Sequence, residues 1–444
     1  MQPRNIEEHI VWYAIRYTWI FYLFGSVYVV GPVVGWGLLA LLAWRFIHGE
    51  TVIISGLTWL WCCGMGIMLL AVIIGHINFD LSTGSLIKSS IGWAKGWALL
   101  AIFPLLAALD IRWQLIVRAC MHLCQQTLYI IPVLIVAAIL QLPDHIYTSP
   151  LKFLASHAFF EVELYGISPV DGSPRWRLFT PWAPALGLIG NMLFCLALLE
   201  KNKKWRWTGI IACIVMILIS QSRMGLLCLL IAPLVTLGLA NIYRISILIA
   251  IAILTPVAAA LYVPAQATLE SFTQQVHAAR ADSSRVRGAL GRIAVERWKN
   301  EAPLWGHGVV EKGPHYVEYM PIGSHHSWYG LLFVKGIFGL IALAIPMLIS
   351  LCICTFLCWR PHSQTKIVYA GLHILVLLSF YSLTENLEVL SYLYWPSLLI
   401  LGMAHNQTIH NKPSCRQDKH TIPSFNPTAL AAGRVRYFQS DNPT

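Results

Sequence analysis

The sequence predicts an all-α, polytopic membrane protein with about twelve transmembrane helices, and two observations support that prediction. Hydrophobic residues make up 57% of the 444 residues, whereas charged residues make up only 11%. Apolar runs of roughly 17 to 25 residues recur along the chain, each long enough to cross a hydrocarbon core of about 30 Å as a helix. This composition is typical of a protein whose surface mostly faces lipid.

The apolar runs also predict the domain organisation. We expect a cytoplasmic N-terminus (1–18), helices 1–9 (19–262), an outer loop (263–326), helices 10–12 (327–405) and a disordered cytoplasmic tail (406–444). Only Gly31-Pro32 separates the first two helices. The expected helices are 19–31, 32–47, 52–76, 92–109, 120–141, 183–199, 206–220, 224–240, 244–262, 327–357, 367–384 and 389–405.

Basic residues orient this topology, because cytoplasmic loops near helix ends are enriched in Lys and Arg. The N-terminus lacks the pattern of a cleaved signal peptide, so the first apolar segment is expected to be an uncleaved anchor and the chain to start inside the cell. Four segments then share the outer side: 142–182, 220–223, 263–326 and 384–388. The residues that mark the cytoplasmic side are Arg45, Arg112, Arg118, Lys201, Lys203, Lys204, Arg206, Arg244, Arg360 and Lys366.

Several function classes are disfavoured by the composition. The formal charge of +11 is spread over loops and tail, so nucleic acid is not needed to explain it. Ten of the 11 cysteines lie within apolar segments, where buried thiols pack well. The sequence has no His-Glu-x-x-His motif, no phosphate-binding Gly-rich loop and no Asp-x-Asp motif. We therefore expect neither a metal nor a cofactor.

Five arginines stand between residues 280 and 297 of the outer loop. Their spacing and an apolar side formed by Leu290, Ile293, Ala294 and Trp298 predict an amphipathic helix, which Gly288 and Gly291 weaken. Two interpretations are open: the helix binds lipid phosphate at the membrane surface, or its guanidinium groups clamp a diphosphate. The five are Arg280, Arg285, Arg287, Arg292 and Arg297.

Three more arginines lie where outer segments meet helices. Arg223 stands where an outer turn re-enters the membrane, a place where a charge is costly unless it has a partner. It either snorkels to lipid headgroups or takes part in function, and we favour function because most snorkelling arginines lie on the cytoplasmic side. The same question applies to Arg175 and Arg177, which precede a helix entry broken by Pro181 and Pro184.

Two histidines, His325 and His326, precede the apolar segment 327–357. A neutral imidazole near physiological pH can accept a proton from an attacking hydroxyl, so either residue is a candidate base. The alternative is that the ring caps the helix or lies in the headgroup layer.

These residues resemble the O-antigen ligase and O-antigen polymerase family. The family pattern of His, a polar residue, nine residues, Gly, two residues and Gly is met by His325, His326, Ser327 to Lys335, Gly336 and, after Ile337-Phe338, Gly339. This register selects His325 as the base. His326 is a secondary candidate, because the family usually has Asn, Ser or Gln at that position.

Two other motifs carry the resemblance, which covers roughly residues 175–390. The family's Arg, three residues, Leu pattern is similar to Arg223–Leu227. Its Arg-rich segment leading into Pro-Leu-x-Gly-x-Gly is similar to Arg287 followed by Pro303–Gly308.

The resemblance implies a bacterial inner-membrane glycosyltransferase of lipopolysaccharide biosynthesis with its active site facing the periplasm. Arginines would hold the diphosphate of an undecaprenyl-diphosphate-linked glycan, and His325 would deprotonate an acceptor hydroxyl that attacks the anomeric carbon with inversion. Glu385 would orient His325 or an arginine, or form a structural ion pair. The diphosphate-binding candidates are Arg175, Arg177, Arg223, Arg285, Arg287 and Arg292.

Alternatives remain open for the acceptor and for the class. Lipid A core is the favoured acceptor, before the end of another repeat unit or a pilin hydroxyl, and membrane lipids are the other expected partner. A twelve-helix transporter is less favoured, because the charges gather at the outer helix ends rather than near the midplane. A membrane glycosyltransferase with an acidic first outer loop is disfavoured, since 29–32 contains no carboxylate.

Overall fold

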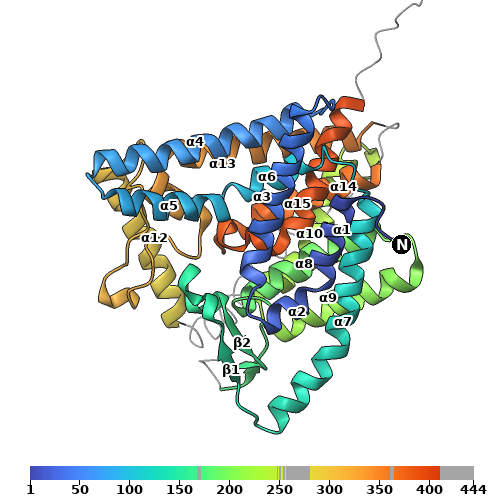
Figure 1. The fold of residues 1–444 in the computed structure, drawn as a ribbon, viewed down its shortest axis with the longest axis horizontal. Helices are drawn as coiled ribbons and strands as arrows, with labels where there is room; N and C mark the ends of the chain where they lie inside the picture. Colours follow the sequence, from blue (N-terminus) through green and yellow to red (C-terminus); the bar gives the residue numbers. More distant parts are fainter. Residues whose placement is uncertain are drawn as a thin grey trace, which may run out of the picture. The chain divides into compact units, whose positions relative to one another are not determined.

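The computed structural model describes residues 1–167, 172–247, 249, 252, 253, 256, 281–360 and 365–410. Helices dominate the described chain, which confirms a polytopic all-α protein (Figure 1). Seven segments of the described part are long and apolar enough to cross a membrane, so the predicted twelve are not confirmed. These segments are Val27–Ile47, Gly56–Asn78, Thr83–Leu106, Trp113–Ile139, Arg223–Asn241, Ser327–Cys358 and Leu387–Ile409, and Ala183–Leu199 and Lys366–Tyr381 are shorter apolar helices.

The element order begins with helices and is interrupted by two small hairpins. The N-terminal helices are α1 (Ile6–Arg16), α2 (Thr18–Leu23), α3 (Val27–Ile47), α4 (Gly56–Asn78), α5 (Thr83–Lys95), α6 (Leu99–Leu106) and α7 (Trp113–Ile139). Antiparallel pairs follow between β1 (His145–Thr148) and β2 (Glu161–Glu163), and between β3 (Gly166–Ile167) and β4 (Pro174–Arg175). The later helices are α8 (Ala183–Leu199), α9 (Lys203–Ser220), α10 (Arg223–Asn241), α12 (Ala281–Glu301), α13 (Ser327–Cys358), α14 (Thr365–Tyr381) and α15 (Leu387–His410).

The predicted break at Gly31-Pro32 is wrong. Helix α3 continues through Pro32, and the residues before it form the short helices α1 and α2 instead of a separate span 19–31. A Cβ atom at Gly31 would lie 2.7 Å from Cα of Tyr392, so α3 packs directly on the α15 backbone there. This packing stabilises α3, although Pro32 lacks an N–H group and so removes one backbone hydrogen bond from the helix.

Other predicted boundaries also shift. The span 92–109 corresponds to the end of α5 and all of α6, which are separate helices on either side of Gly96. Helix α15 reaches His410, so the first residues of the predicted tail are helical. Most of the predicted helix 244–262, Arg280 and residues 411–444 lie outside the described residues.

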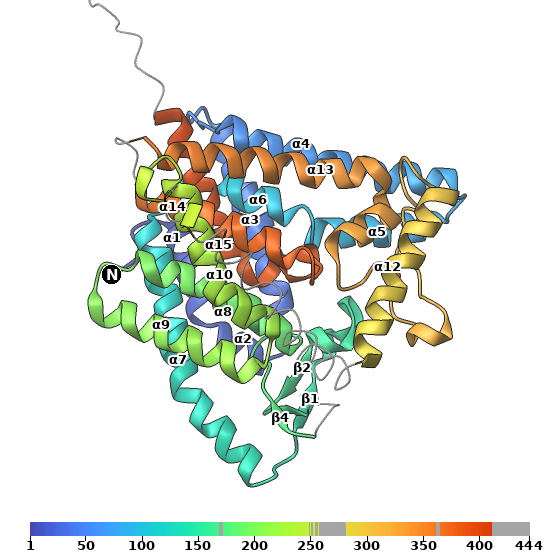
Figure 2. The ribbon, with the colours of Figure 1, turned by 180° about the vertical axis from the view of Figure 1, so that it is seen from behind.

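Helices α8, α14 and α15 are the most enclosed of the later helices, and their buried side chains form one core with α3, α6 and α7. Helix α13 runs along α4, as both views show (Figures 1 and 2). Gly64 permits this approach, because a Cβ atom there would lie 2.3 Å from the carbonyl oxygen of Ala342. The N-terminal end of α13 therefore projects beside α5 and α12, where the candidate site lies.

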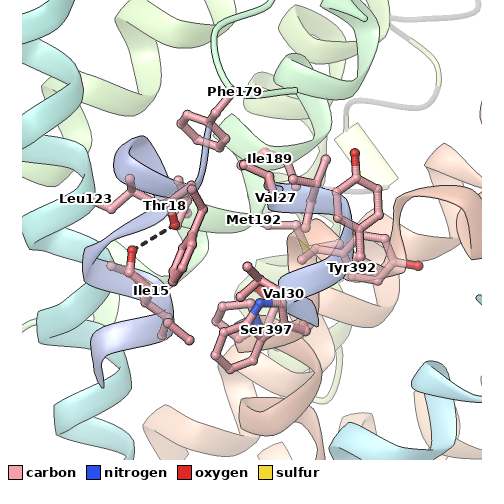
Figure 3. Close-up of a pocket in the computed structure, with 18 residues that line it drawn as sticks. Ile15, Thr18, Val27, Val30, Leu123, Phe179, Ile189, Met192, Tyr392 and Ser397 are labelled. Atoms are coloured by element: carbon pink, nitrogen blue, oxygen red, sulfur yellow. Dashed lines mark hydrogen bonds between the residues drawn. The ribbon is translucent and has the colours of Figure 1, made fainter. Parts of the chain in front are cut away.

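A small cavity of about 40 Å³ lies within the core, between the N-terminal helices and α7, α8 and α15 (Figure 3). Its wall consists mainly of apolar side chains, including Ile15, Val27, Leu123 and Met192. No Lys, Arg, Asp, Glu or His of the described chain lines it. We attribute this cavity to imperfect packing, because it is small and its wall offers no charged group for a glycan or a diphosphate.

Candidate functional site

A break in α13 shapes the site. Gly336 has φ +61° and ψ −160°, which interrupts the helix at a glycine of the predicted motif. The loop 303–308 covers the break: the amides of Ile337 and Gly308 donate hydrogen bonds to the carbonyls of Pro303 and Val334, at 3.0 and 2.9 Å. Backbone groups freed by the break thus find partners in the Pro-Leu-x-Gly-x-Gly segment.

The glycines of this segment are required by close backbone contacts. A Cβ atom at Gly336 would lie 2.3 Å from the carbonyl oxygen of Leu304, and one at Gly306 would lie 2.4 Å from the amide nitrogen of Lys335. Gly306 also has φ +70°, a left-handed conformation that glycine adopts without cost. The two motifs recognised separately in the sequence therefore form one structural unit.

The first turn of α13 is fastened to the turn between α14 and α15. The Ser327 hydroxyl donates to the Glu385 carbonyl at 2.7 Å and accepts from the Leu387 amide at 3.0 Å. The His326 amide donates to the Asn386 side chain at 3.0 Å. These bonds hold His325 and Glu385, which are 60 residues apart in sequence, at the same end of the helical core.

His325 occupies a strained position just before α13. Its φ is +62°, a left-handed conformation that is uncommon for a side chain larger than glycine and often found at functional sites. Burial, and second the positive charge of Arg287, lower the pKa of His325 to about 4. The imidazole is therefore neutral near pH 7, which is the form that accepts a proton.

His326 has a different role in the structure. Its Nδ1 accepts a hydrogen bond from the Tyr329 amide at 3.4 Å, so the ring is the N-cap of α13. The ring also stacks on Tyr329 with 4.0 Å between centroids. The capping alternative considered from sequence thus describes His326, whereas the His325 ring forms no hydrogen bond with any described residue.

Glu385 lies buried in the turn, with 3% of its surface exposed. Its Oε2 accepts a hydrogen bond from the Trp182 indole at 3.1 Å. Burial raises the pKa of Glu385 to about 7, while Arg287 and the indole act in the opposite direction. This carboxyl group can therefore exchange a proton near neutral pH, and it forms no salt bridge with a described residue.

Helix α12 brings Arg287 to this place. The predicted amphipathic helix is confirmed, with Leu290 and Ala294 fully buried on its apolar side. A Cβ atom at Gly291 would lie 2.8 Å from the Tyr329 ring, so glycine allows α12 to pack against the first turn of α13. Arg287 affects the pKa of both His325 and Glu385, which makes it the shared neighbour of the two groups.

The other predicted arginines of α12 differ in their surroundings. Arg285 and Arg292 are exposed, and Arg292 lines an open groove with Tyr329. Arg297 binds two carboxylates, Glu301 at 2.8 Å and Glu311 at 2.5 Å, and these contacts raise its pKa further. The charge of Arg297 is thereby neutralised within the protein.

Arg223 and Arg175 belong to the same end of the helical core. Arg223 is exposed in the first turn of α10, and the Arg175 Nε donates to the neighbouring Ser220 carbonyl at 3.0 Å. The Asn191 amide connects this turn to α14, because it donates to the Gly225 carbonyl at 2.9 Å and the Tyr381 hydroxyl at 3.0 Å. Tyr381 directly precedes the turn that carries Glu385.

Arg177 is held by protein groups. Its Nε lies 2.7 Å from Glu163 and its Nη2 lies 3.3 Å from Glu161, both on β2. Its Nη1 donates to the Pro181 carbonyl at 2.8 Å. With two carboxylate partners, Arg177 is better placed to fix the hairpin against the entry of α8 than to bind an anion.

Sequence reasoning missed four residues around the site. Trp182 and Asn386 each bind a site segment directly, as described above, and the position of Asn386 next to Glu385 was the available signal. Lys335 and Glu388 are ionisable residues in apolar helices, a pattern that itself indicates function. Within the described ranges, no three His, Cys, Asp or Glu side chains come together as a metal site would require.

Comparison with protein families gives a match over part of the chain. No curated protein matches the chain. Residues 208–344 match the family described as O-Antigen ligase, and this range contains Arg223, Arg287, His325 and the motif glycines Gly336 and Gly339. This match supports the resemblance of the chain to the O-antigen ligase and polymerase family, whose members are membrane glycan transferases.

Proposed function

We propose that this protein is an O-antigen ligase-like glycosyltransferase that moves a polyprenyl-diphosphate-linked glycan to an acceptor hydroxyl. The observation that carries the proposal is the electrostatic influence of Arg287 on both His325 and Glu385. A cation that can bind phosphate, a neutral imidazole and a carboxyl group that titrates near neutral pH thus meet at one end of the helical core. Fold alone would not identify an activity, but this combination fits glycan transfer.

In the proposed reaction the acceptor oxygen attacks the anomeric carbon of the donor sugar. The carbon–oxygen bond to the diphosphate breaks, the configuration at the carbon inverts, and the polyprenyl diphosphate leaves with the bonding electrons. A ring nitrogen of His325 takes the hydroxyl proton as the new bond forms. Arg287, with Arg285, Arg292, Arg175 and Arg223 as further candidates, stabilises the charge on the leaving group, so the step needs no general acid.

Donor binding would also tune the base. A pKa of about 4 makes His325 a weak base in the free protein, and the charge of Arg287 is the second cause of that low value. A diphosphate at Arg287 would neutralise this charge and raise the pKa of His325 towards the value of an ordinary histidine. The imidazole would thus become a stronger base when the donor is in place.

Glu385 is the second candidate for an acid–base role. Its pKa of about 7 lies in the range in which a general base works well at physiological pH. The Trp182 indole and the Ser327 contacts fix this turn, which favours Glu385 as a positioning residue for Arg287 and His325. A role as the base itself is the alternative that the pH dependence below distinguishes.

The cellular setting follows from the same proposal. We place the site at the periplasmic face of the bacterial inner membrane, because the segments assigned to the outer side from basic residues are the ones that surround His325. The donor would be an undecaprenyl-diphosphate-linked glycan and the favoured acceptor lipid A core. A repeat-unit polymerase and a pilin glycosyltransferase are the alternatives within the family, and a transporter is the alternative outside it.

Mass spectrometry of the products tests the proposal. Purified wild type and His325→Ala are each supplied with a polyprenyl-diphosphate oligosaccharide and lipid A core. Glycan attached to the core by wild type alone is the expected result. An elongated donor would identify a polymerase. A donor that remains intact with both acceptors would contradict these two activities and favour a pilin acceptor or transport.

A further inference from the structure

A second cavity, of about 420 Å³ and with charged side chains in its wall, lies beside the candidate site. It is bounded by α5, the N-terminal half of α13 and the start of α15, and both ribbon views place α5 and α12 at this end of α13 (Figures 1 and 2). Ser324, Gly330 and Asn386 line it, and two of these residues directly adjoin His325 and Glu385 in sequence. Its volume is in the range of cavities that bind small ligands, about 300 to 1,000 Å³.

Lys335 is the most unusual group in the wall of this cavity. Only 6% of its surface is exposed, yet its ammonium group forms no hydrogen bond or ion pair with any described residue. The ammonium lies 5.4 Å from the centroid of the Trp97 ring, a weaker contact than an ion pair. The carboxyl group of Glu388 acts electrostatically on this ammonium group but forms no ion pair with it, so the buried charge is only partly compensated and can accept an anionic ligand.

The broken helix creates the space for this side chain. Lys335 directly precedes the break at Gly336. A Cβ atom at Gly339 would lie 2.2 Å from the Lys335 Cβ and 3.4 Å from its Cγ and Cδ. Both motif glycines of α13 therefore serve the placement of Lys335, in addition to the packing of the loop 303–308.

Two more lysines and one glutamate complete the charged lining. Lys95 donates to the Leu154 carbonyl at 2.8 Å and lies over the Tyr28 ring, while Lys88 is exposed. Glu388 has a buried oxygen, Oε2, that accepts no hydrogen bond from the described residues. With three lysines and a single glutamate, the cavity is positive, and Glu388 remains available to accept a hydrogen bond from a hydroxyl group.

We propose that this cavity binds an anionic group, phosphate or carboxylate, on the acceptor glycan, with Lys335 as its main contact. The inference rests on the proposed function, because only a glycan transferase has an acceptor. The arginines on the α12 side are assigned to the donor diphosphate, which leaves this cavity for the acceptor. A sugar held here would have its hydroxyl groups next to Ser324 and Asn386, and so close to His325. The geometry thus separates donor and acceptor on two sides of the first turn of α13.

Equilibrium binding to the full-length protein in detergent, with no donor present, tests this inference. Mannose 6-phosphate is compared with mannose, and glucuronic acid with glucose, so that the two arms separate phosphate from carboxylate. Wild type is expected to bind at least one charged sugar about tenfold more tightly than its neutral counterpart. Lys335→Gln should remove that preference, and Lys88→Gln should weaken it, because both lysines line the cavity.

Three controls keep the test decisive. Lys203→Gln, at an exposed lysine on α9, and Arg287→Gln should both retain the preference for the charged sugar. Because Lys335 is buried, thermal unfolding checks that its variant is folded, and the exposed Lys88 provides a variant that should fold normally. Equal binding of charged and neutral sugars by wild type would overturn the inference. So would a preference for the charged sugar that Arg287→Gln abolishes. The same holds for a preference that folded Lys335→Gln and Lys88→Gln both retain.

The binding result is independent of the transfer reaction. If glycan transfer occurs but the charged sugars show no preference, only the anion site is wrong. If the preference depends on Lys335 but no acceptor is glycosylated, the anion site stands and the proposed function fails.

Discussion

The two ends of helix α8 differ in how their charges are paired. At its C-terminal end, Glu200 accepts hydrogen bonds from Arg118 of α7 at 2.8 and 2.9 Å, and Glu8 lies 2.6 Å from Arg112, which directly precedes α7. At its N-terminal end, about 25 Å away for a helix of this length, Arg177 is also paired, but Trp182 binds Glu385 in a region where Arg287 forms no salt bridge with a described carboxylate. Arginines at the first end stabilise the fold, whereas Arg287 is available for a ligand.

The largest expected effect comes from His325. We expect His325→Ala to reduce glycan transfer by about 10²- to 10⁴-fold, because it removes the proposed general base. His326→Ala is the matched control: it loses an N-cap bond and should cost about 1 kcal/mol of stability, with a smaller loss of activity. Transfer rates measured by product mass spectrometry compare the two. Equal losses in both variants would contradict the assignment of the base to His325.

The next effect separates the two ends of α8 directly. Arg287→Gln should reduce transfer by roughly 10- to 100-fold through weaker diphosphate binding, with little change in thermal unfolding, since the arginine is exposed and forms no salt bridge with a described residue. Transfer rates at several donor concentrations and a thermal melt in detergent measure both properties. A lowered melting temperature with unchanged transfer would show that Arg287 is structural.

Arg118→Gln should give the opposite result. Removing one partner of a mostly buried pair leaves Glu200 uncompensated and should cost about 3 kcal/mol of stability. Thermal unfolding of the purified protein measures this loss, and the folded fraction should retain the wild-type transfer rate. A normal melting temperature would mean that the paired end contributes less to the fold than its geometry suggests.

The sequence predicted the helical membrane class from the length of its apolar runs. It predicted the helix that carries the arginines from the helical spacing of apolar and basic residues. It also selected His325 over His326 by register, and the structure supplies a physical difference between them, since His326 caps α13. Span boundaries were harder to predict. Pro32 predicts a break in the helix, but the packing of Gly31 against α15 keeps α3 continuous.

Contacts between distant segments were beyond sequence reasoning. Arg177 and Arg287 look alike in sequence, but one binds Glu161 and Glu163 from a hairpin and the other approaches His325 and Glu385. The two glycine motifs gave no sign that Gly306 and Gly336 touch each other. Lys335 stands within the motif spacing between His325 and Gly336, and that spacing gives no sign of a role for its own charge.

The pH dependence of transfer is the smallest expected effect and identifies the base. A base is active when deprotonated, so kcat/KM is expected to fall as the pH drops through the pKa of the base in the free protein. A fall near pH 4 would assign His325, whose pKa is about 4, whereas a fall near pH 7 would assign Glu385, whose pKa is about 7.

The variant Arg287→Gln sharpens this measurement. Arg287 lowers the pKa of both groups, so its removal should raise both values and move the fall in kcat/KM to higher pH, whichever residue is the base. Arg118→Gln, at the paired end of α8, should leave the midpoint of the fall unchanged. An unchanged midpoint in Arg287→Gln would mean that the base lies beyond the influence of this arginine, and that the grouping of Arg287, His325 and Glu385 is not the centre of the reaction.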